Sequence, residues 1–372
     1  MPGMMSMARF PALPDALRQA RLAPPARGAA VVIDTDCANE IDDQFALAWA
    51  LLAGDRLDLR GVCAAPFSFE HRRRELVRAR VARDRPHAAS DDDRELLALH
   101  AARLARWEGE GWDVASVALH GLVPPDEGMR LSLLEIERVH RLLGLRPEGR
   151  VHAGSTRWFE AAAPEASAAT ACLIEQTIAL PPGQPLYVLA MGCLSNIANA
   201  LRMQPGLAER IVVVWTAGYP SHTPWRHRAF NLEQDVAAAQ CVFDSGVPLV
   251  YLPGYHVGAQ LRLSLAEVER HVRPCGAIGA YLHGLFAHNP LWPLAGPPAR
   301  MDAHSWVIWD LIVVAWMLDP GWVSSALVPT PCIGGDLYFR PGSGRVPMRE
   351  GTAVARDAIF NDLFDRLARA PG

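Results

Sequence analysis

Short apolar runs alternate along this chain with segments whose apolar residues recur at helical spacing. The runs are rich in β-branched residues and are typical of buried strands. They lie at residues 29–33, 59–65, 186–192, 211–215 and 247–252. The first run is followed by apolar positions at helical spacing from Ile41 to Leu52, with Gly54 at a C-terminal cap position. This alternation predicts an α/β fold with a mostly parallel central sheet and helices on both faces.

The first predicted strand ends in a cluster of acidic residues. Five carboxyl groups lie within ten residues, without a basic residue among them: Asp34, Asp36, Glu40, Asp42 and Asp43. Like charges this close raise one another's pKa unless a cation lies between them, and a hard divalent cation with oxygen ligands meets that need. The carboxyl end of a strand is also where open α/β sheets bind ligands. The sequence therefore predicts a metal site, in preference to an exposed helix N-terminus with unrelated acids.

A further acid stands alone in an apolar helix. Residues 305–318 are apolar on nearly all sides except at Asp310. A carboxylate in such a helix has to be paired, hydrogen-bonded or bound to a metal. We expect Asp310 to be the distant ligand of the acid cluster, and a hydrogen-bonded core acid is the alternative.

Two segments differ in amino-acid composition from the rest of the chain. Residues 1–28 contain five prolines and no continuous apolar run, which predicts an N-terminal arm rather than a signal peptide. Residues 70–122 are dense in balanced charge. They are expected to form a solvated helical insertion, and a lid or a partner surface is the functional alternative. Residues 29–372, with this insertion, are expected to form a single α/β domain.

Composition narrows the classes of function. The net charge is −4, so the chain has no overall basic field for nucleic acid or an anionic membrane. All 36 basic residues are Arg, which excludes a Schiff-base lysine and the lysine of a phosphate-binding loop. The seven cysteines form no Cys-x-x-Cys pair, which argues against a thiolate zinc site. The most apolar run, 306–318, is shorter than the about 20 residues of a bilayer span. We expect a soluble, cytoplasmic protein.

Ordered motifs along the chain resemble those of the inosine-uridine-preferring nucleoside hydrolase family. They lie at residues 34–36, 42–47, 191–196, 229–231 and 309–310. The first two correspond to the family's N-terminal acidic signature, the third to its Gly-x-Leu-Thr-Asn turn, the fourth to its Glu-Phe-Asn segment and the last to its His-Asp pair. The resemblance covers about residues 29–340, with the insertion set aside. It implies a nucleoside hydrolase-like, Rossmann-related fold and a homodimer or homotetramer.

The resemblance also implies a set of metal ligands. A calcium ion would be held by Asp36, Asp43, Asp310 and the main-chain carbonyl of Met191, with the ribose diol completing the shell. Oxygen-only ligands agree with a hard ion. Asp36 would take the proton of a metal-bound water that attacks the anomeric carbon directly, with inversion.

Other positions are implied to contact the substrate. Asp42 would bind the ribose hydroxyls, and Asn231 the far side of the sugar, with Phe230 beside it. Ser68 and Trp309 would lie on the substrate side as well. Asn231 has an alternative role as a helix cap.

The chain departs from the family's pattern at several places. The loop with Asn39 and Glu40 is two residues longer than usual. Ala229 stands where a glutamate is common, Trp309 replaces a histidine, and Ser68 replaces an asparagine. These changes leave the metal and much of the ribose half intact and alter the half that would bind the base.

Two explanations for departure of the base stay open. Trp309 or Trp225 would stack on the base, or His222 or His227 would protonate it. Taken singly, the histidines are more often loop residues than acids, and tryptophans are more often core residues than base platforms.

The sequence thus supports calcium-dependent hydrolysis of a ribonucleoside, or a close analogue, to free base and ribose, as in purine or pyrimidine salvage. A ribosyl-ligand binding protein that kept the metal and lost the chemistry is the alternative, because the glutamate and the histidine are missing. A phosphatase of the Asp-x-Asp type, with Asp34 as nucleophile, ranks low because that class normally uses a lysine.

Overall fold

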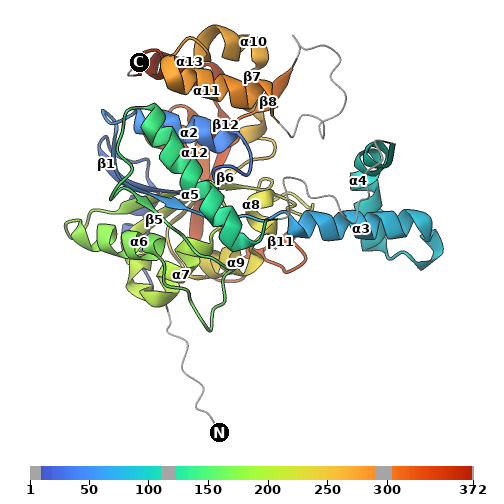
Figure 1. The fold of residues 1–372 in the computed structure, drawn as a ribbon. Helices are drawn as coiled ribbons and strands as arrows, with labels where there is room; N and C mark the ends of the chain where they lie inside the picture. Colours follow the sequence, from blue (N-terminus) through green and yellow to red (C-terminus); the bar gives the residue numbers. More distant parts are fainter. Residues whose placement is uncertain (1–9, 110–122, 290–303, 371–372) are drawn as a thin grey trace.

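The computed structural model describes residues 10–109, 123–289 and 304–370. At its centre lies an eight-stranded sheet of order β3-β2-β1-β4-β5-β6-β12-β9 (Figure 1). These strands are β1 (Ala29–Thr35), β2 (Leu57–Ala64), β3 (Val151–His152), β4 (Leu186–Ala190), β5 (Ile211–Ala217), β6 (Leu249–Pro253), β9 (Val323–Pro329) and β12 (Pro347–Val354). Neighbouring strands are parallel except β12 and β9, which are antiparallel. The prediction of a mostly parallel α/β sheet is confirmed.

Strand β1 lies where the strand order reverses. β2 follows β1 in the chain and pairs with one side of it, whereas β4 pairs with the other side. In a doubly wound sheet, such a reversal leaves a crevice outside the carboxyl ends of the two strands. The acid cluster follows β1 directly, so it lies at this crevice.

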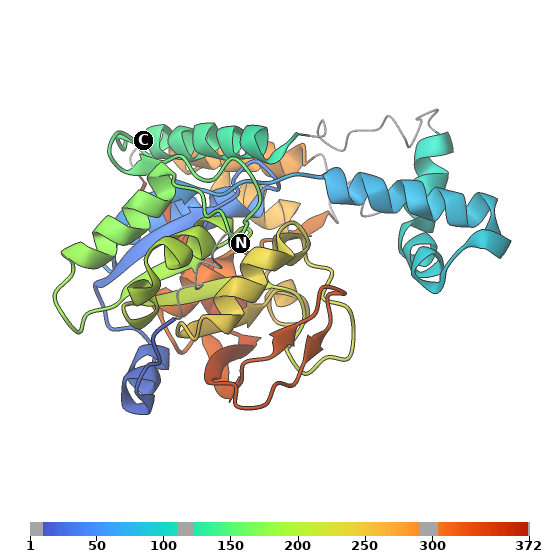
Figure 2. The ribbon, with the colours of Figure 1, turned by 90° about the horizontal axis from the view of Figure 1, so that it is seen from below.

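Helices cover both faces of the sheet (Figures 1 and 2). The helices outside the insertion are α1 (Asp15–Leu22), α2 (Asp42–Leu51), α5 (Pro125–Leu142), α6 (Ala168–Ala179), α7 (Ser195–Met203), α8 (Phe230–Glu233), α9 (Val236–Asp244), α10 (Leu265–Glu267), α11 (Gly276–Ala287), α12 (Leu311–Leu318) and α13 (Arg356–Leu367). Strand β1 supplies two cores, because successive side chains point to opposite faces. Val31 and Ile33 pack with α2, α5 and α12, whereas Ala30 and Val32 pack with α6, α7 and α9.

Two small antiparallel ribbons lie outside the main sheet. One joins β7 (Arg262–Ser264) to β8 (Ser305–Val307), and the other joins β10 (Cys332–Ile333) to β11 (Phe339–Arg340). The first of them leads directly to Asp310 and α12. Among the described residues, no helix is long and apolar enough to cross a membrane.

The N-terminal segment contains more structure than an arm. Residues 15–22 form α1, and Leu22 at its end is fully buried in the core. Arg21 donates a 2.8 Å hydrogen bond to the carbonyl of Gly183. The first nine residues of the predicted arm lie outside the described residues.

The charged insertion projects from the body as two packed helices, α3 (Glu70–Asp84) and α4 (Asp91–Gly109) (Figures 1 and 2). They enclose a small core of their own, formed by Leu76, Ala79, Leu96 and Leu104. The rest of the predicted insertion, up to residue 122, lies mostly outside the described part of the chain.

Candidate functional site

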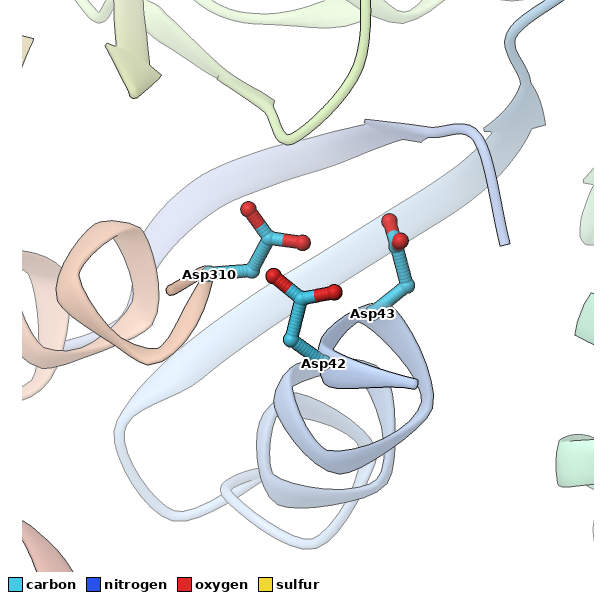
Figure 3. A group of neighbouring side chains, drawn as sticks. All are labelled: Asp42, Asp43 and Asp310. Carbon is cyan, nitrogen blue, oxygen red and sulfur yellow. The ribbon is translucent and has the colours of Figure 1, made fainter. Parts of the chain in front are cut away.

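Three carboxylates converge at the carboxyl end of β1. Oxygen atoms of Asp42, Asp43 and Asp310 lie within 4.8 Å of one another, and all three side chains are buried (Figure 3). Asp42 and Asp43 occupy the first turn of α2, where the helix dipole favours negative charge. Asp310 immediately precedes α12. The structure thus brings the lone acid of the apolar segment next to the acid cluster.

Asp36 lies just beyond the end of β1 and is 1% exposed. It is not part of the group of three, although its negative charge raises the pKa of both Asp43 and Asp310. The amide of Gln234 is 3.4 Å from Oδ2 of Asp36, and Oδ1 has no hydrogen-bond partner among the described residues. A side chain at Gly192 would meet Asp36 Cγ at 3.0 Å, so glycine leaves room for this carboxylate.

Burial and mutual repulsion disfavour the ionised forms of these acids. Burial raises the pKa of Asp43 and of Asp310 well above the usual range of a carboxyl group. The neighbouring charges that add to the rise at Asp310 all come from other carboxylates: Asp42, Asp43, Asp36 and Glu40. Oxygen ligands held close together, buried and without compensating charge are what a hard divalent cation requires. The residues therefore fit a calcium-type ion.

Asp34 lies within β1 and is separate from the three converging carboxylates. It is fully buried, and its Oδ1 accepts a 2.8 Å hydrogen bond from Asn196 at the start of α7. Burial raises the pKa of Asp34 to about 7. Asp34 is thus held by Asn196 and is not one of the three converging carboxylates.

Asn231 connects the ends of two strands. Its amide donates hydrogen bonds to the carbonyls of Met191 at 2.8 Å and Thr216 at 3.1 Å, beyond β4 and near the end of β5. The carbonyl of Met191 retains a second lone pair for another partner. Asn231 lies inside α8, and Ala229 occupies the N-cap position, so Asn231 is not a helix cap.

The other residues predicted to contact the substrate are Ser68, Phe230 and Trp309. The hydroxyl of Ser68 accepts a 3.2 Å hydrogen bond from the amide of Glu70 at the start of α3. Phe230 packs against Phe69 with ring centroids 4.9 Å apart. Trp309, which is half-buried beside Asp310, forms a T-shaped pair with Tyr255, with ring centroids 5.7 Å apart.

The two candidate acids occupy different environments. His222 is exposed. His227 is fully buried, stacks on Phe339 at 3.7 Å and accepts a hydrogen bond at Nδ1 from the amide of Tyr219. Burial lowers the pKa of His227 to about 4, so its imidazole is neutral at pH 7. We therefore discard His227 as a leaving-group acid, while His222 remains a prediction. Trp225, the alternative platform, is 52% exposed.

The contacts at the site that were not anticipated from the sequence include those of Gln234 and Glu40. Gln234 bridges Asp36 and the amide of Ser68, and only its place between Asn231 and Asp235 could have drawn attention to it. Glu40 accepts a 2.6 Å hydrogen bond from the indole of Trp306 on β8. The longer loop is thereby tied to the strand that precedes Asp310.

The chain matches the model of a known protein family. The family model described as inosine-uridine preferring nucleoside hydrolase matches residues 109–355, about two thirds of the chain. The acid cluster after β1 precedes the matched residues.

Individual proteins that are similar to this chain include ribonucleoside hydrolases. The pyrimidine-specific ribonucleoside hydrolase RihA of Salmonella paratyphi A is 29% identical over 145 residues, which are 37% of this chain and 43% of that protein. The chain thus matches less than half the length of this curated relative. A purine-preferring ribonucleoside hydrolase from Gardnerella vaginalis superposes with a TM-score of 0.60 at 17% identity, over 92% of this chain and 98% of that one. An inosine-uridine preferring nucleoside hydrolase from Bacillus anthracis gives 0.55 at 16% identity, over 92% and 99%. At such identities, the two structures show a common fold.

Proposed function

The chain belongs to the inosine-uridine preferring nucleoside hydrolase family, and on that premise we propose that it hydrolyses the N-glycosidic bond of a ribonucleoside with the help of a calcium ion. The observation that carries the proposal is the convergence of Asp42, Asp43 and Asp310, with Asp36 beside them, at the carboxyl ends of β1 and β4. Family relatives whose names specify pyrimidine and purine nucleosides support a nucleoside substrate and leave the base open.

The ligands proposed for the ion are Asp36, Asp43, Asp310 and the carbonyl of Met191, and Asp42 is close enough to join them. When bound, calcium would supply positive charge that orients the ribose diol and lowers the pKa of a water molecule.

Asp36 is the proposed general base. Its Oδ1 is available to take a proton, while Gln234 holds Oδ2. The water oxygen forms a bond to the anomeric carbon as the bond to the base nitrogen breaks, and the electron pair of that bond leaves with the base. Direct attack through an oxocarbenium-like state gives ribose with inverted configuration.

Different residues are proposed to bind the sugar and the base. Asp42 accepts hydrogen bonds from the ribose hydroxyls, and Asn231 contacts the other side of the sugar. Trp309 is the proposed platform for the base, because it adjoins Asp310 and is only half-buried. Stacking on an indole favours departure of a purine without a dedicated acid.

The experiment is to measure reducing sugar released from a panel of purine and pyrimidine ribonucleosides, with calcium and with a chelator. Turnover that disappears with chelator and returns with calcium supports the proposal. Turnover that is unaffected by complete removal of metal contradicts the role of calcium.

A second candidate function is binding of a ribosyl ligand without hydrolysis. The burial of neutral His227 and the replacement of a histidine by Trp309 favour it, since both weaken protonation of a leaving base. Calorimetric binding of ribonucleosides in the presence of calcium, with no sugar released by any member of the panel, would establish this function and exclude hydrolysis.

A further inference from the structure

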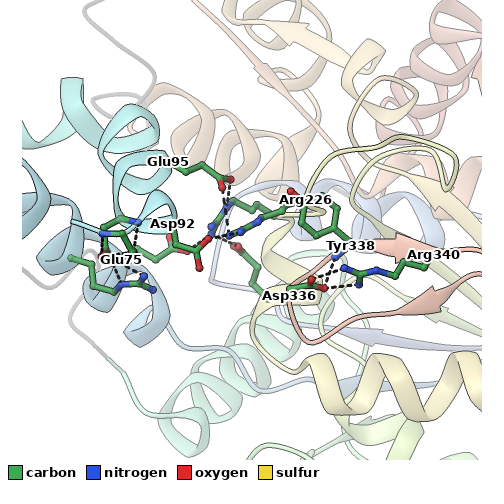
Figure 4. Close-up of polar contacts among 12 residues, drawn as sticks. Glu75, Asp92, Glu95, Arg226, Asp336, Tyr338 and Arg340 are labelled. Carbon is green, nitrogen blue, oxygen red and sulfur yellow. Dashed lines mark hydrogen bonds and ion pairs between the residues drawn. The ribbon is translucent and has the colours of Figure 1, made fainter. Parts of the chain in front are cut away.

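The α3–α4 insertion is joined to the body by a network of ion pairs (Figure 4). The body contributes Arg226 and Arg228, which lie between β5 and α8. Arg228 Nη1 is 2.6 Å from Oε1 of Glu75 on α3. Arg226 Nη2 is 2.5 Å from Oδ1 of Asp92 on α4. Both arginines also lie within 3.6 Å of Glu95, so the two helices are held by one short segment of the body.

Arg228 also connects the insertion to α8. Its Nη1 is 3.2 Å from Oε1 of Glu233, the last residue of that helix. The side chains of Arg228, Glu75 and Glu233 are 18%, 14% and 5% exposed, so this part of the network is largely shielded from water. Removing the arginine would take the shared cation from two nearly buried carboxylates, whose other partners include the imidazoles of His100 and His71, and this is more unfavourable than losing a surface ion pair.

Contacts of the same segment extend to the candidate site. Phe230 packs against Phe69, and against His71 in the first turn of α3 with ring centroids 5.6 Å apart. The main-chain carbonyl of Arg228 accepts a 3.0 Å hydrogen bond from Tyr255, whose ring touches Trp309. The residues around Arg228 therefore contact the insertion on one side and the proposed base platform on the other.

We propose that the α3–α4 insertion is a substrate-positioning element that holds Arg228, and through it α8, so that Phe230 and Asn231 stay beside the acid cluster. The nature of the substrate rests on the proposed function, whereas the mechanical connection does not. The insertion thereby contributes to specificity although it supplies no ligand to the metal.

Two variants that replace a charged side chain by uncharged glutamine test the connection. A third replacement of the same kind, inside the insertion, is the control. Arg228→Gln removes the ion pair with α8, and Glu75→Gln removes the ion pair by which α3 holds Arg228. Arg83→Gln is the control, because Arg83 pairs with Glu108 inside the insertion, at 2.6 Å and in an exposed position. We expect KM for the best nucleoside to rise about tenfold in the first two variants, with the calcium Kd within about twofold of the wild type. The control should leave both constants within about twofold of the wild type.

Hydrogen exchange provides a readout that does not depend on turnover. The amides of Leu232, Glu233 and Gln234 donate hydrogen bonds within the turn of α8. Their exchange should become about tenfold faster in Arg228→Gln and Glu75→Gln and should not change in Arg83→Gln. Unchanged exchange in folded Glu75→Gln, or equal acceleration in the control, overturns the proposal. If Arg228→Gln fails to fold, Glu75→Gln decides in its place.

Failure of the two proposals is distinguishable. A wild-type protein that releases no sugar from any nucleoside contradicts the proposed function, but its exchange data still decide whether the insertion positions α8. Normal turnover with unchanged KM in Glu75→Gln contradicts the insertion's role and leaves the hydrolase intact.

Discussion

The side-chain amide of Gln234 lies between Asp36 and Ser68: its nitrogen is 3.4 Å from Oδ2 of Asp36, and its oxygen accepts a 2.8 Å hydrogen bond from the amide of Ser68. Gln234 is 8% exposed, and the next residue, Asp235, caps α9 and accepts a hydrogen bond from the hydroxyl of Ser195. Its backbone is thus firmly placed. One oxygen of the proposed base is oriented, and the other is left for the water.

Replacement of Gln234 by Leu should reduce kcat by about 10- to 100-fold, because the orientation of Asp36 is lost and the amide of Ser68 is left without its acceptor. KM should change less than kcat. Steady-state kinetics at saturating calcium measure both. Gln260→Leu is the control, since Gln260 is bonded to the carbonyl of His256 in an exposed position. Equal losses in the two variants would contradict a specific role for Gln234.

Asp310→Asn should separate activity from stability. It removes one of several repelling, buried carboxylates, so the metal-free protein should be stabilised by about 1 kcal/mol, while kcat/KM falls by more than about 100-fold. Thermal unfolding with chelator and nucleoside kinetics with calcium give the two values. Asp244→Asn, at an exposed pair with Arg345, serves as the control. Retention of calcium affinity in Asp310→Asn would exclude this residue as a ligand.

Calcium binding should strengthen as the pH rises. Burial raises the pKa of Asp36, Asp43 and Asp310, so the metal-free site holds protons at neutral pH that the ion has to displace. The apparent Kd should fall about tenfold per pH unit for each proton displaced. Calorimetry between pH 6 and 8, in two buffers of different ionisation enthalpy, counts the protons released. A Kd that does not depend on pH would show that the carboxylates are already ionised.

His227 should make the free energy of unfolding rise with pH between about 4 and 6.5. Its pKa is about 4 in the folded protein and about 6.5 when unfolded, so between these values only the unfolded chain binds the proton. Above pH 6.5, neutral His227 therefore contributes up to about 3 kcal/mol to the free energy of unfolding. This contribution is lost as the pH falls toward 4.

The measurement is urea unfolding of the metal-free protein at several pH values between 4.5 and 7. His227→Gln should flatten the acid side of the stability curve relative to the wild type, and His222→Gln, at an exposed site, should not. Comparison with the wild type removes the opposing contribution of the buried carboxyl groups, which both proteins share.

The unit formed by β1 and α2 was predictable because its pattern is local. Val31 and Ile33 face one core while Ala30 and Val32 face the other, and a continuous apolar run is what such a strand requires. Asp310 was recognisable as well, since a charge in an apolar segment needs a partner, but residues 305–307 form β8 and the helix begins only after Asp310, at Leu311.

Other features depend on tertiary packing that single-sequence reasoning does not reach. Gln234 meets Asp36 only because two loops that are distant in sequence come together at the sheet edge. The burial of His227 depends on Phe339, which lies more than a hundred residues later. Helix α1 was overlooked because of its flanking prolines, yet Pro14 occupies the N-cap position, so it marks the boundary of the helix and does not interrupt it.

The distance along the chain between the carboxylates has a consequence for biosynthesis. Asp310 follows Asp43 by 310 − 43 = 267 residues. At about 5–20 residues per second, a ribosome takes roughly 13 to 50 seconds to make this stretch. During that time the site lacks the carboxylate of Asp310. The proposed ion site is therefore complete only after Asp310 has emerged from the ribosome.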